Sequence, residues 1–459
     1  PGRLHEWESF QGHLKEAKRL RIDGVSTDVW WGLIEPKPNQ FNWGYYDHLS
    51  GKIISNGLKW VPIMGFHACG GNVGDTVNVP VPTWVWSHVA GKMGSNNPDA
   101  GKYVSEQGNT NHEYVQAWST DHALPLYKNV MTAFQNQYAG KANHIPEINI
   151  SLGPAGEARY PSYNSHDRDT GWPNRGALQC YSEAAINSFR QWALEKYGDE
   201  SGVKRVWGAE YGTDIAPPRD VDSFYRNNHH QQTQYGRDFF DWYSNSLIDH
   251  GKKVLGTSLE VFGSGAPFER SEIGFKLPGV HWRMGYRQNG QIVVGDRLAE
   301  LNAGLIRTSS NDWHSDDLGR GYRPIIRSFA ELTQKPGGDR LVLHFTCLEL
   351  ADGVDGAKAN SLPYSLARWV GQEARLAGLP LKGENALGWN LPNAAAWQSM
   401  SGHLDLPGQK GQYRGLTLLR LSDVLGTETA RWHIDALMKN INRFRKQPTE
   451  SVDSKKTAG

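Results

Sequence analysis

The chain has 459 residues, of which 49 are Lys or Arg and 48 are Asp or Glu, so its formal net charge is +1 with histidine neutral. This balance argues against a nucleic-acid-binding protein, which usually carries a basic excess or a basic stripe. Apolar residues make up 38% of the chain and aromatic residues 11%. That composition is typical of a globular protein with a large core and excludes a disordered chain.

The sequence also argues against a membrane-spanning protein and against a protein built on disulfides or a zinc cluster. No stretch approaches the roughly 18 uninterrupted apolar residues that a membrane-spanning helix needs, and the N-terminal segment PGRLHEWESF lacks the regions of a signal peptide. The three cysteines, Cys69, Cys180 and Cys347, have no CxxC spacing, so they indicate neither a disulfide framework nor a zinc cluster. The sequence leaves open whether two of them form a disulfide.

Short apolar segments alternate with segments of helical periodicity along most of the chain. The predicted strands are residues 25–31, 58–66, 146–152, 273–280, 341–347, 379–384 and 414–420. The predicted helices are residues 10–21, 44–56, 121–139, 180–197, 235–251, 322–334, 363–377 and 428–444. This alternation predicts a mostly parallel sheet under helices, either doubly wound or closed as a (β/α)8 barrel.

A helix precedes the first of these strands, so a closed barrel needs one more strand before Pro1. We expect one (β/α)8 domain over residues 1–446, with that strand missing, and a flexible polar tail over residues 447–459. The connections over residues 67–120 and 153–180 are long, and we expect the others to be short. Long connections usually form lids or binding walls.

Polar side chains follow each predicted strand. They are Asp28, His67, Asp75, Glu157, His281, Thr346, Glu349, Glu384 and Arg420. One carboxylate after a strand is often only a helix cap, but in a barrel all these strand ends meet at one face, where active sites lie. Four tryptophans are interleaved with them: Trp30, Trp31, Trp172 and Trp282. Together they predict a polar cleft with aromatic walls, which suits sugars.

Two long motifs and five short ones resemble one family. HACGGNVGD at 67–75 and GPAGEARYPSY at 153–163 are similar to the two signature motifs of the β-amylases, glycoside hydrolase family 14. The supporting matches are DVWWG at 28–32, KLPGVHW at 276–282, FTCLE at 345–349, GENAL at 383–387 and LLRLSD at 418–423. They occur in family order across residues 1–440.

The resemblance implies a (β/α)8 barrel whose long loops form a lobe over the active site. It also implies hydrolysis of α-1,4-glucosidic bonds from the non-reducing ends of starch-like glucans, with release of β-maltose by inversion. Inversion needs two carboxyl groups about 6.5–9.5 Å apart, with space for a water between. The resemblance assigns Glu157 as general acid and Glu384 as general base. The structural alternatives are an ion pair with Arg159 for Glu157 and a helix N-terminal carboxylate for Glu384.

The resemblance also assigns substrate contacts. Asp75 ends a glycine-rich segment that would close over the substrate as a lid. The alternative interpretation is a rigid turn that Asp75 caps. Thr346 would lie in an inner loop that shifts on binding, or would pack as a strand threonine. The other assigned contacts are Asp28, His67, Lys276, His281, Asn385 and Arg420 for hydroxyl groups, with Trp282 and Leu387 for apolar contact.

We expect no cofactor and no metal, because Lys37 and Pro38 stand where calcium-binding members would carry acids. The expected ligands are starch, maltodextrin or maltose, bound by a monomer without a starch-binding domain. We expect a secreted enzyme, because starch is too large to import. Two alternatives stay open: a catalytically silent glucan-binding homologue, and a barrel glycosidase for another polysaccharide.

Overall fold

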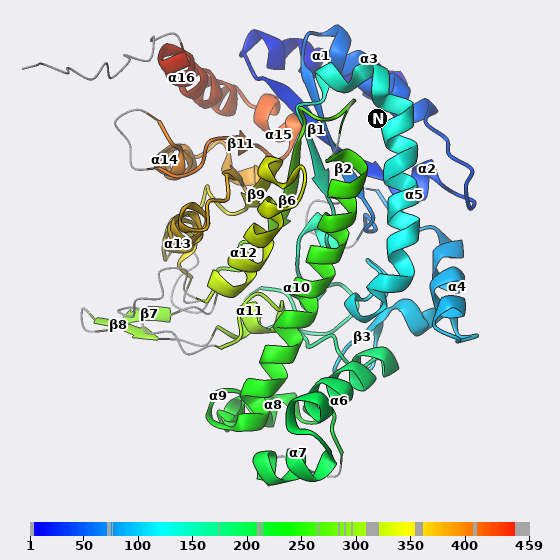
Figure 1. Cartoon of the computed structure of the whole chain (residues 1–459). Helices are drawn as coiled ribbons and strands as arrows, with labels where there is room; N and C mark the ends of the chain where they lie inside the picture. The colour runs from blue at the N-terminus through cyan, green and yellow to red at the C-terminus, as the bar shows by residue number, and fades with distance from the viewer. Residues whose placement is uncertain are drawn as a thin grey trace, which may run out of the picture.

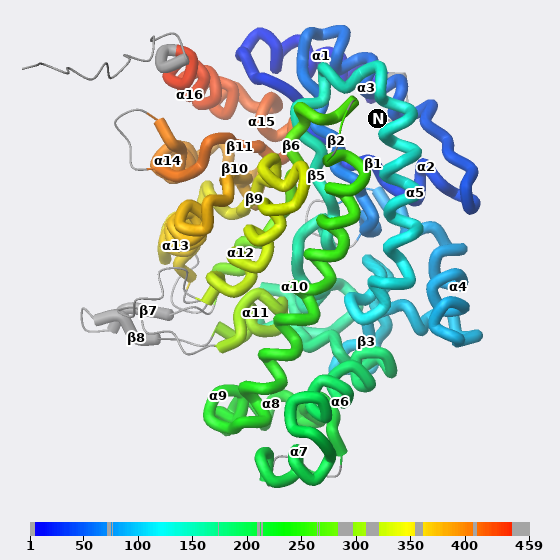
Figure 2. Tube along the Cα trace, in the orientation of Figure 1, coloured from blue at the N-terminus to red at the C-terminus, as the bar shows by residue number. Residues whose placement is uncertain are grey.

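The computed structural model describes most of the chain. The described residues are 4–70, 75, 77–172, 174–208, 212, 214–263, 265, 267–282, 285–288, 291–294, 297–308, 321–353, 361–406 and 411–445. A sheet with the strand order β1-β2-β5-β6-β9-β10-β11 lies at the centre, under helices such as α10 and α12 (Figures 1 and 2). Every neighbouring pair in it is parallel. Strand order therefore follows chain order, as repeated βα units of one handedness require.

All seven predicted strands are confirmed. Their bounds are β1 Gly24–Trp30, β2 Lys59–Gly65, β5 Glu147–Ile150, β6 Glu272–Leu277, β9 Leu341–Phe345, β10 Leu381–Glu384 and β11 Leu416–Thr417. β5 and β9 are buried along their whole length, which is typical of parallel strands covered on both faces. β11 is much shorter than the predicted segment 414–420, because it pairs with β10 through only two residues.

The predicted helices are also confirmed. Their bounds are α1 Leu4–Arg19, α3 Gly44–Ser55, α5 Thr120–Tyr138, α6 Glu183–Tyr197, α10 Gln234–Phe262, α12 Arg323–Ala330, α13 Pro363–Leu376 and α16 Glu428–Arg445. α6 begins after the predicted residue 180, because the Ser182 side chain caps it by accepting a hydrogen bond from the Ala185 N–H. α10 extends past the predicted end at 251, and its last turns remain buried.

Shorter elements were not predicted, because most of them are too short to show a periodicity of their own. They are the helices α2 Trp31–Ile34, α4 Thr83–Lys92, α7 Glu200–Trp207, α8 Val221–Arg226, α9 His229–Gln232, α11 Leu298–Asn302, α14 Ala394–His403 and α15 Leu421–Gly426, and the strands β3 Tyr103–Val104, β4 Thr110–Asn111, β7 Gly285–Gln288 and β8 Gln291–Val294. Most of them lie in the connections that follow the sheet strands.

These connections form a lobe at the C-terminal ends of the strands. The segment after β2 carries α4, β3 and β4, and the segment after β5 carries α6 to α9, so the two predicted long connections are confirmed. The prediction that the others are short is wrong after β6, where β7, β8 and α11 precede α12. Figure 1 shows α6 to α9 together beyond the start of α10, which then returns along the sheet.

The two ends of the sheet lie near each other, so the sheet is curled into an α/β barrel. α1 precedes β1 and contacts α15, which follows β11, and Figure 2 shows these helices side by side. Arg21 and Asp435 also pair there, with 3.3 Å between guanidinium nitrogen and carboxylate oxygen. The eighth strand before Pro1 stays a prediction, and the predicted tail at 447–459 lies outside the described residues.

The core takes up one side chain that was expected in the cleft. Trp31 is buried and its indole contacts Phe66, Trp84 and Tyr127, with ring centroids 5.9, 5.9 and 5.6 Å away. The expectation that Trp31 lines the cleft is therefore wrong, whereas Trp30 is only partly buried. The three cysteines are buried as well, and none of them forms a disulfide.

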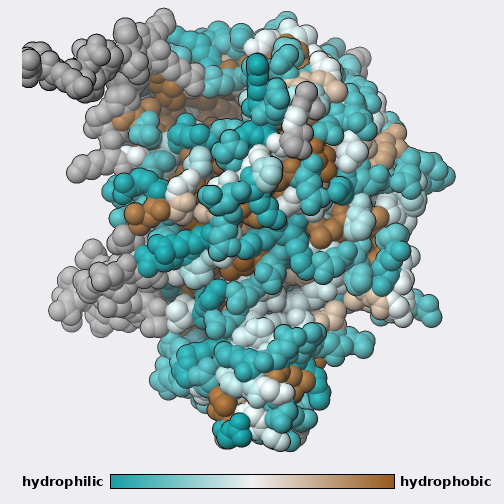
Figure 3. Space-filling model, viewed as in Figure 1, coloured by the Kyte–Doolittle hydropathy of each residue, from teal (hydrophilic) through white to brown (hydrophobic). Residues whose placement is uncertain are grey.

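The face of the molecule in Figure 3 is mostly hydrophilic, with smaller hydrophobic areas scattered over it. Within the part of the chain that the structure describes, no helix has both the length and the apolar character of a membrane span. This surface is ordinary for a globular domain, since apolar atoms always contribute part of the exposed area.

Candidate active site

Glu384 is the last residue of β10, and its carboxylate is buried against one side chain from β6 and one from β9. Lys276 Nζ on β6 lies 2.8 Å from Oε1 and 3.0 Å from Oε2 of Glu384. His344 Nδ1 on β9 lies 3.5 Å from Oε1. Burial acts to raise the pKa of Glu384, but Lys276 and His344 outweigh it and lower the pKa to about 2. Glu384 is therefore ionised at any ordinary pH.

Glu157 follows β5 through a tight turn, and its carboxyl group is mostly buried. The backbone of Glu157 forms a bridge to Lys276, and the Ala158 N–H donates to the Lys276 carbonyl at 2.8 Å. Burial raises the pKa of Glu157, and the Arg159 guanidinium offsets only part of that effect. Arg159 Nε donates to Glu157 Oε2 at 2.9 Å, so the ion pair that was kept as an alternative does form.

The two carboxyl groups have opposite pKa shifts although they share one neighbourhood. Lys276 acts electrostatically on both of them, and the Glu384 charge contributes to the raised pKa of Glu157. A carboxyl group with a raised pKa beside an ionised one is the arrangement that lets one residue act as acid and the other as base. The structure therefore brings Glu157 and Glu384 together, from positions far apart in the sequence.

A third carboxyl group, that of Asp28 on β1, belongs to the same neighbourhood. Burial raises its pKa to about 6, while Lys276 opposes this shift and Glu384 adds to it. Asp75 and Arg420 also act on Asp28 electrostatically, and the two lie 4.0 Å apart, nitrogen to oxygen. The structure thus gathers side chains from β1, β6, β10 and the segments after β2 and β11.

Asp75 makes the contact expected of a capped turn. Its Oδ2 accepts a hydrogen bond from the Gly70 N–H at 2.9 Å, and Gly70 has a positive φ of 113°, which favours glycine. Residues 71–74 and 76 lie outside the described residues, so the lid stays a prediction.

His67 follows β2 and lies beside the turn that carries Glu157. Its Nδ1 is 2.7 Å from Ser151 Oγ, and its ring meets the Trp30 indole edge-on at 4.9 Å. A methyl group on Gly156 would lie only 3.3 Å from the His67 ring. Burial, with a contribution from Lys276, lowers the pKa of His67 to about 3, so this imidazole is neutral near pH 7.

Three other assigned residues lie in a second group, after β6 and β9. Thr346 Oγ1 accepts a hydrogen bond from the Gly279 N–H at 2.7 Å. His281 Nδ1 lies 2.6 Å from Ser361 Oγ, and Trp282 Nε1 donates to the Asn174 carbonyl at 2.7 Å. The Trp282 ring also contacts the Tyr163 ring at 5.4 Å. Since the Tyr163 hydroxyl lies 3.5 Å from Glu157 Oε2, this group adjoins the Glu157 side of the site.

Comparison with known proteins places this arrangement in a family. The family model of Glycosyl hydrolase family 14 matches residues 1–446. The chain belongs to glycosyl hydrolase family 14. This membership and its relatives, which are beta-amylases, make it a glycoside hydrolase of the β-amylase type.

Relatives of this family 14 enzyme cover most of its length. The thermophilic beta-amylase of Thermoanaerobacterium thermosulfurigenes is 34% identical over 93% of this chain and 70% of its own. The beta-amylase of Cytobacillus firmus is 34% identical over 93% of this chain and 81% of its own. The crystal structure of the catalytic domain of beta-amylase from Paenibacillus polymyxa matches with a TM-score of 0.78 at 30% identity, covering 98% of this chain and 97% of that one. A GH42 beta-galactosidase from G. stearothermophilus, with a TM-score of 0.53 at 11% identity, shares only the fold.

Two of the residues assigned to substrate contact form hydrogen bonds within the protein: Asn385 through its side chain and Leu387 through its backbone N–H. Asn385 Nδ2 donates to the Leu419 carbonyl at 2.9 Å, and its Oδ1 accepts from the Leu419 N–H at 2.6 Å. Asn385 therefore fastens the end of β10 to the segment before Arg420. The Leu387 N–H donates to Glu349 Oε1 at 2.7 Å, and the Leu387 side chain is partly buried. Glu349 is thus a carboxylate that holds the loop after β10.

Sequence reasoning missed several residues of this site. Tyr163, whose hydroxyl lies 3.5 Å from Glu157 Oε2, was not expected there, whereas the ion pair of Arg159 with Glu157 was considered. His344, Glu147 and Lys382 form a buried charged group next to Glu384. The available signal was a histidine inside the apolar segment LVLHF and a glutamate inside PEINISL, since charged groups within buried strands need partners.

The described residues contain no group of three or more His, Cys, Asp or Glu side chains that could hold a metal ion. In the segment where calcium was considered, Glu35 accepts hydrogen bonds from Trp31 Nε1 at 2.7 Å and from the Asn39 N–H at 2.8 Å. Both of its oxygens therefore already have protein donors.

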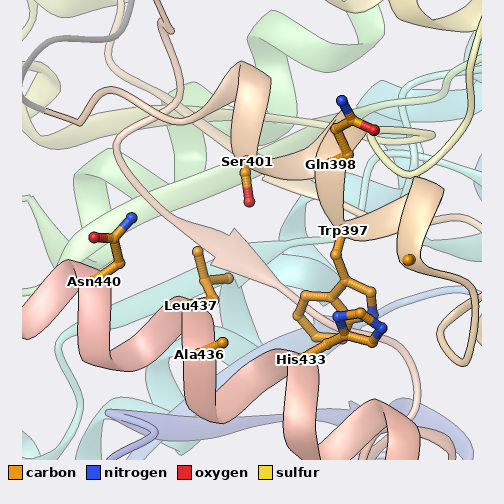
Figure 4. A pocket seen from close by; sticks show the side chains of 8 residues that line it. Trp397, Gln398, Ser401, His433, Ala436, Leu437 and Asn440 are labelled. Atoms are coloured by element: carbon orange, nitrogen blue, oxygen red, sulfur yellow. The ribbon is translucent and has the colours of Figure 1, made fainter.

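A surface pocket of ≈ 290 Å³ lies between α14 and α16, away from these residues. Figure 4 shows Trp397 and His433 stacked in it, with Gln398, Ser401 and Asn440 around its rim. None of the assigned site residues lines it, so it belongs to a different part of the surface.

Proposed function

We propose that this enzyme hydrolyses the α-1,4-glucosidic bonds of starch-like glucans from their non-reducing ends and releases β-maltose with inversion. The observation that supports the proposal best is the pair of carboxyl groups beside Lys276, one with a raised and one with a lowered pKa. The substrate class follows from the relatives, which are beta-amylases.

In the proposed mechanism, Glu157 is the general acid. Burial raises its pKa, which favours the protonated form that a general acid needs, and Glu157 donates that proton to the glycosidic oxygen as the bond to the anomeric carbon breaks. Glu384 is the general base, and it accepts a proton from the water that attacks the anomeric carbon on the opposite face. The leaving glucan thus carries the proton of Glu157, and maltose carries the hydroxyl group of water with the inverted configuration. Glu384 then releases its proton to solvent and Glu157 takes one up before the next turnover.

The surrounding side chains are proposed to hold sugar hydroxyl groups. Neutral His67 can donate or accept a hydrogen bond, and Asp28, with a pKa near 6, can do either according to pH. The further proposed hydroxyl contacts are Asp75, Lys276, His281, Thr346, Asn385 and Arg420, and the proposed apolar contacts are Trp282 and Leu387. Binding of a non-reducing end by this set would make the enzyme exo-acting.

The natural ligands in this proposal are starch, maltodextrin and maltose. Because long glucans cannot cross a cell membrane intact, we further propose that the enzyme acts outside the cell, as a monomer.

The test is incubation with soluble starch, followed by analysis of the products and their anomers before mutarotation. We expect maltose as the main product, in the β configuration. Release of the α anomer would contradict inversion, and release of mixed longer oligosaccharides would contradict exo-action. Tight maltodextrin binding without any reducing-sugar release would identify the catalytically silent homologue instead.

A further inference from the structure

His344 of β9 lies between two carboxylates that come from two other strands of the sheet. Its Nε2 is 2.6 Å from Oε1 of Glu147 on β5, and its Nδ1 is 3.5 Å from Oε1 of Glu384 on β10. All three side chains are buried. The imidazole therefore bridges Glu384, the proposed base, to a carboxylate that takes no part in the mechanism described above.

Glu147 is in turn held ionised by further donors. Its Oε2 pairs with Lys382 Nζ on β10, and its Oε1 accepts a hydrogen bond from Asn149 Nδ2 at 3.0 Å. Lys382 Nζ also lies 2.6 Å from Glu272 Oε2, and Glu272 pairs with the partly exposed Arg414. Burial acts to raise the pKa of Glu147, but His344 and Lys382 outweigh it and hold the pKa well below its usual range.

The charges around His344 favour its protonated form. The groups that face it are the carboxylates of Glu147 and Glu384, with Lys276 and Lys382 at the paired positions of β6 and β10. Burial opposes protonation, yet the two carboxylates outweigh it and raise the pKa of His344. Only the imidazolium carries a hydrogen on both ring nitrogens, so only that form can face Glu147 through Nε2 and Glu384 through Nδ1 with a positive edge on each side; the Nδ1 contact is an ion pair without a hydrogen bond.

Glu384 is therefore contacted by two side chains. Lys276 Nζ lies 2.8 Å from Oε1 and 3.0 Å from Oε2, and His344 Nδ1 lies 3.5 Å from Oε1. Each positive charge beside the carboxylate favours its ionised form.

We propose that His344 is a positioning residue of the reaction: as an imidazolium held by Glu147, it pairs with Glu384 and keeps that carboxylate ionised and in place to accept the proton of the attacking water. This inference rests on the proposed role of Glu384 as general base. It assigns Glu147 and Lys382 a supporting role, because they hold the carboxylate that keeps His344 charged.

The test compares His344→Gln and Glu147→Gln with the wild-type enzyme by measuring kcat and KM from about pH 2 to pH 8, a range that reaches down to the pKa of Glu384. Removing the imidazolium raises the pKa of Glu384, and activity needs this residue ionised. The acidic limb of the profile should therefore move to higher pH by about one unit or more, with a lower kcat and little change in KM. Glu147→Gln should move the limb in the same direction, because His344 then loses its proton more readily.

The double variant H344Q/E147Q provides the second readout. If the two residues act as one unit, the double variant should lose no more kcat than the worse single variant, whereas independent effects would multiply. His250→Gln is the matched control, since His250 is another buried histidine but contacts Thr120 and Leu152 instead. We expect its acidic limb to coincide with that of the wild type. Near-ultraviolet circular dichroism at each pH shows which variants remain folded.

A folded His344→Gln enzyme with the wild-type acidic limb, or effects of the two substitutions that multiply, would overturn the proposal. These outcomes are distinct from failure of the proposed function, which would appear as a wild-type enzyme without maltose release or as an active Glu384→Gln variant. Either of those results would contradict the role of Glu384 as general base, and the proposed role of His344 would be contradicted with it.

Discussion

At the scale of single residues, the same chemical group has two different properties in one site. Glu384 has Lys276 within 2.8 Å and His344 within 3.5 Å, and these cations keep it ionised. Glu157 pairs with Arg159 and also feels the charge of Lys276, but together these cations do not fully offset the effect of burial on its pKa. The difference between acid and base is therefore a difference in surroundings, and it can be tested by replacing each carboxyl group with an amide.

We predict that Glu157→Gln and Glu384→Gln each lower kcat by about two to four orders of magnitude, because each removes one proton transfer. Maltose affinity should change little, since the amide keeps the shape of the side chain. The measurements are reducing-sugar release for kcat and calorimetric titration with maltose for affinity.

Asp28→Asn is the control for this pair, because Asp28 is another carboxyl group in the same neighbourhood whose pKa is raised. We expect it to affect KM more than kcat, since its proposed role is to hold a hydroxyl group. If Asp28→Asn abolished turnover while Glu157→Gln remained active, the acid would be Asp28.

At the scale of elements, the turn between β5 and Glu157 has no space for a side chain at its first residue. A methyl group on Gly153 would lie 2.5 Å from the Glu157 carbonyl oxygen and 2.7 Å from that of Arg159. Both contacts are with backbone atoms, so no side-chain rotation can relieve them. The turn itself is held by the Gly156 N–H, which donates to the Gly153 carbonyl at 3.0 Å.

We predict that Gly153→Ala destabilises the protein by about 1–3 kcal/mol and lowers kcat further than this loss of stability explains, because the turn that positions Glu157 must shift. Gly51→Ala in α3 is the matched control, since a methyl group there meets nothing within 4 Å. It should stabilise the helix by about 0.5–1 kcal/mol. Urea denaturation and starch assays of both variants make the comparison, and equal kcat values would show that the turn tolerates a side chain.

Strands and long helices could be predicted because their apolar residues recur with the period of the element. β9 and α5, for example, lie where the pattern places them. β7 and β8 were missed although Asn289-Gly290 stands between them in the sequence, which is a hairpin signal. The site could be predicted through motifs that resemble a family, whereas Tyr163 and His344 could not, because only the folded chain brings them to Glu157 and Glu384.

At the scale of the whole molecule, His250 joins three parts of the structure. Its Nε2 lies 2.9 Å from the carbonyl oxygen of Leu152, after β5, and its Nδ1 lies 2.6 Å from Thr120 Oγ1 at the start of α5. Burial lowers the pKa of this α10 residue from 6.5 to about 4. Between these two pH values, His250 binds a proton in the unfolded chain but stays neutral in the folded protein.

The stability that His250 contributes is present above pH 6.5 and is lost as the pH falls from 6.5 to about 4. We therefore predict that His250→Gln makes the decline of stability across this range less steep, by about 1.4 kcal/mol per pH unit. Chemical denaturation at several pH values measures the slope in both proteins. An identical slope would show that His250 is protonated equally in the folded and unfolded states.

Arg21 and Asp435 are 414 positions apart in the sequence, yet their side chains meet where α1 approaches α15. During synthesis on the ribosome, the segment around Arg21 emerges long before its partner exists. Contacts between residues so far apart in the sequence form slowly. The surface of α1 that contacts α15 therefore stays exposed until the last helices have been translated. Uncovered apolar surface and unpaired strand edges of this kind make folding intermediates prone to aggregation.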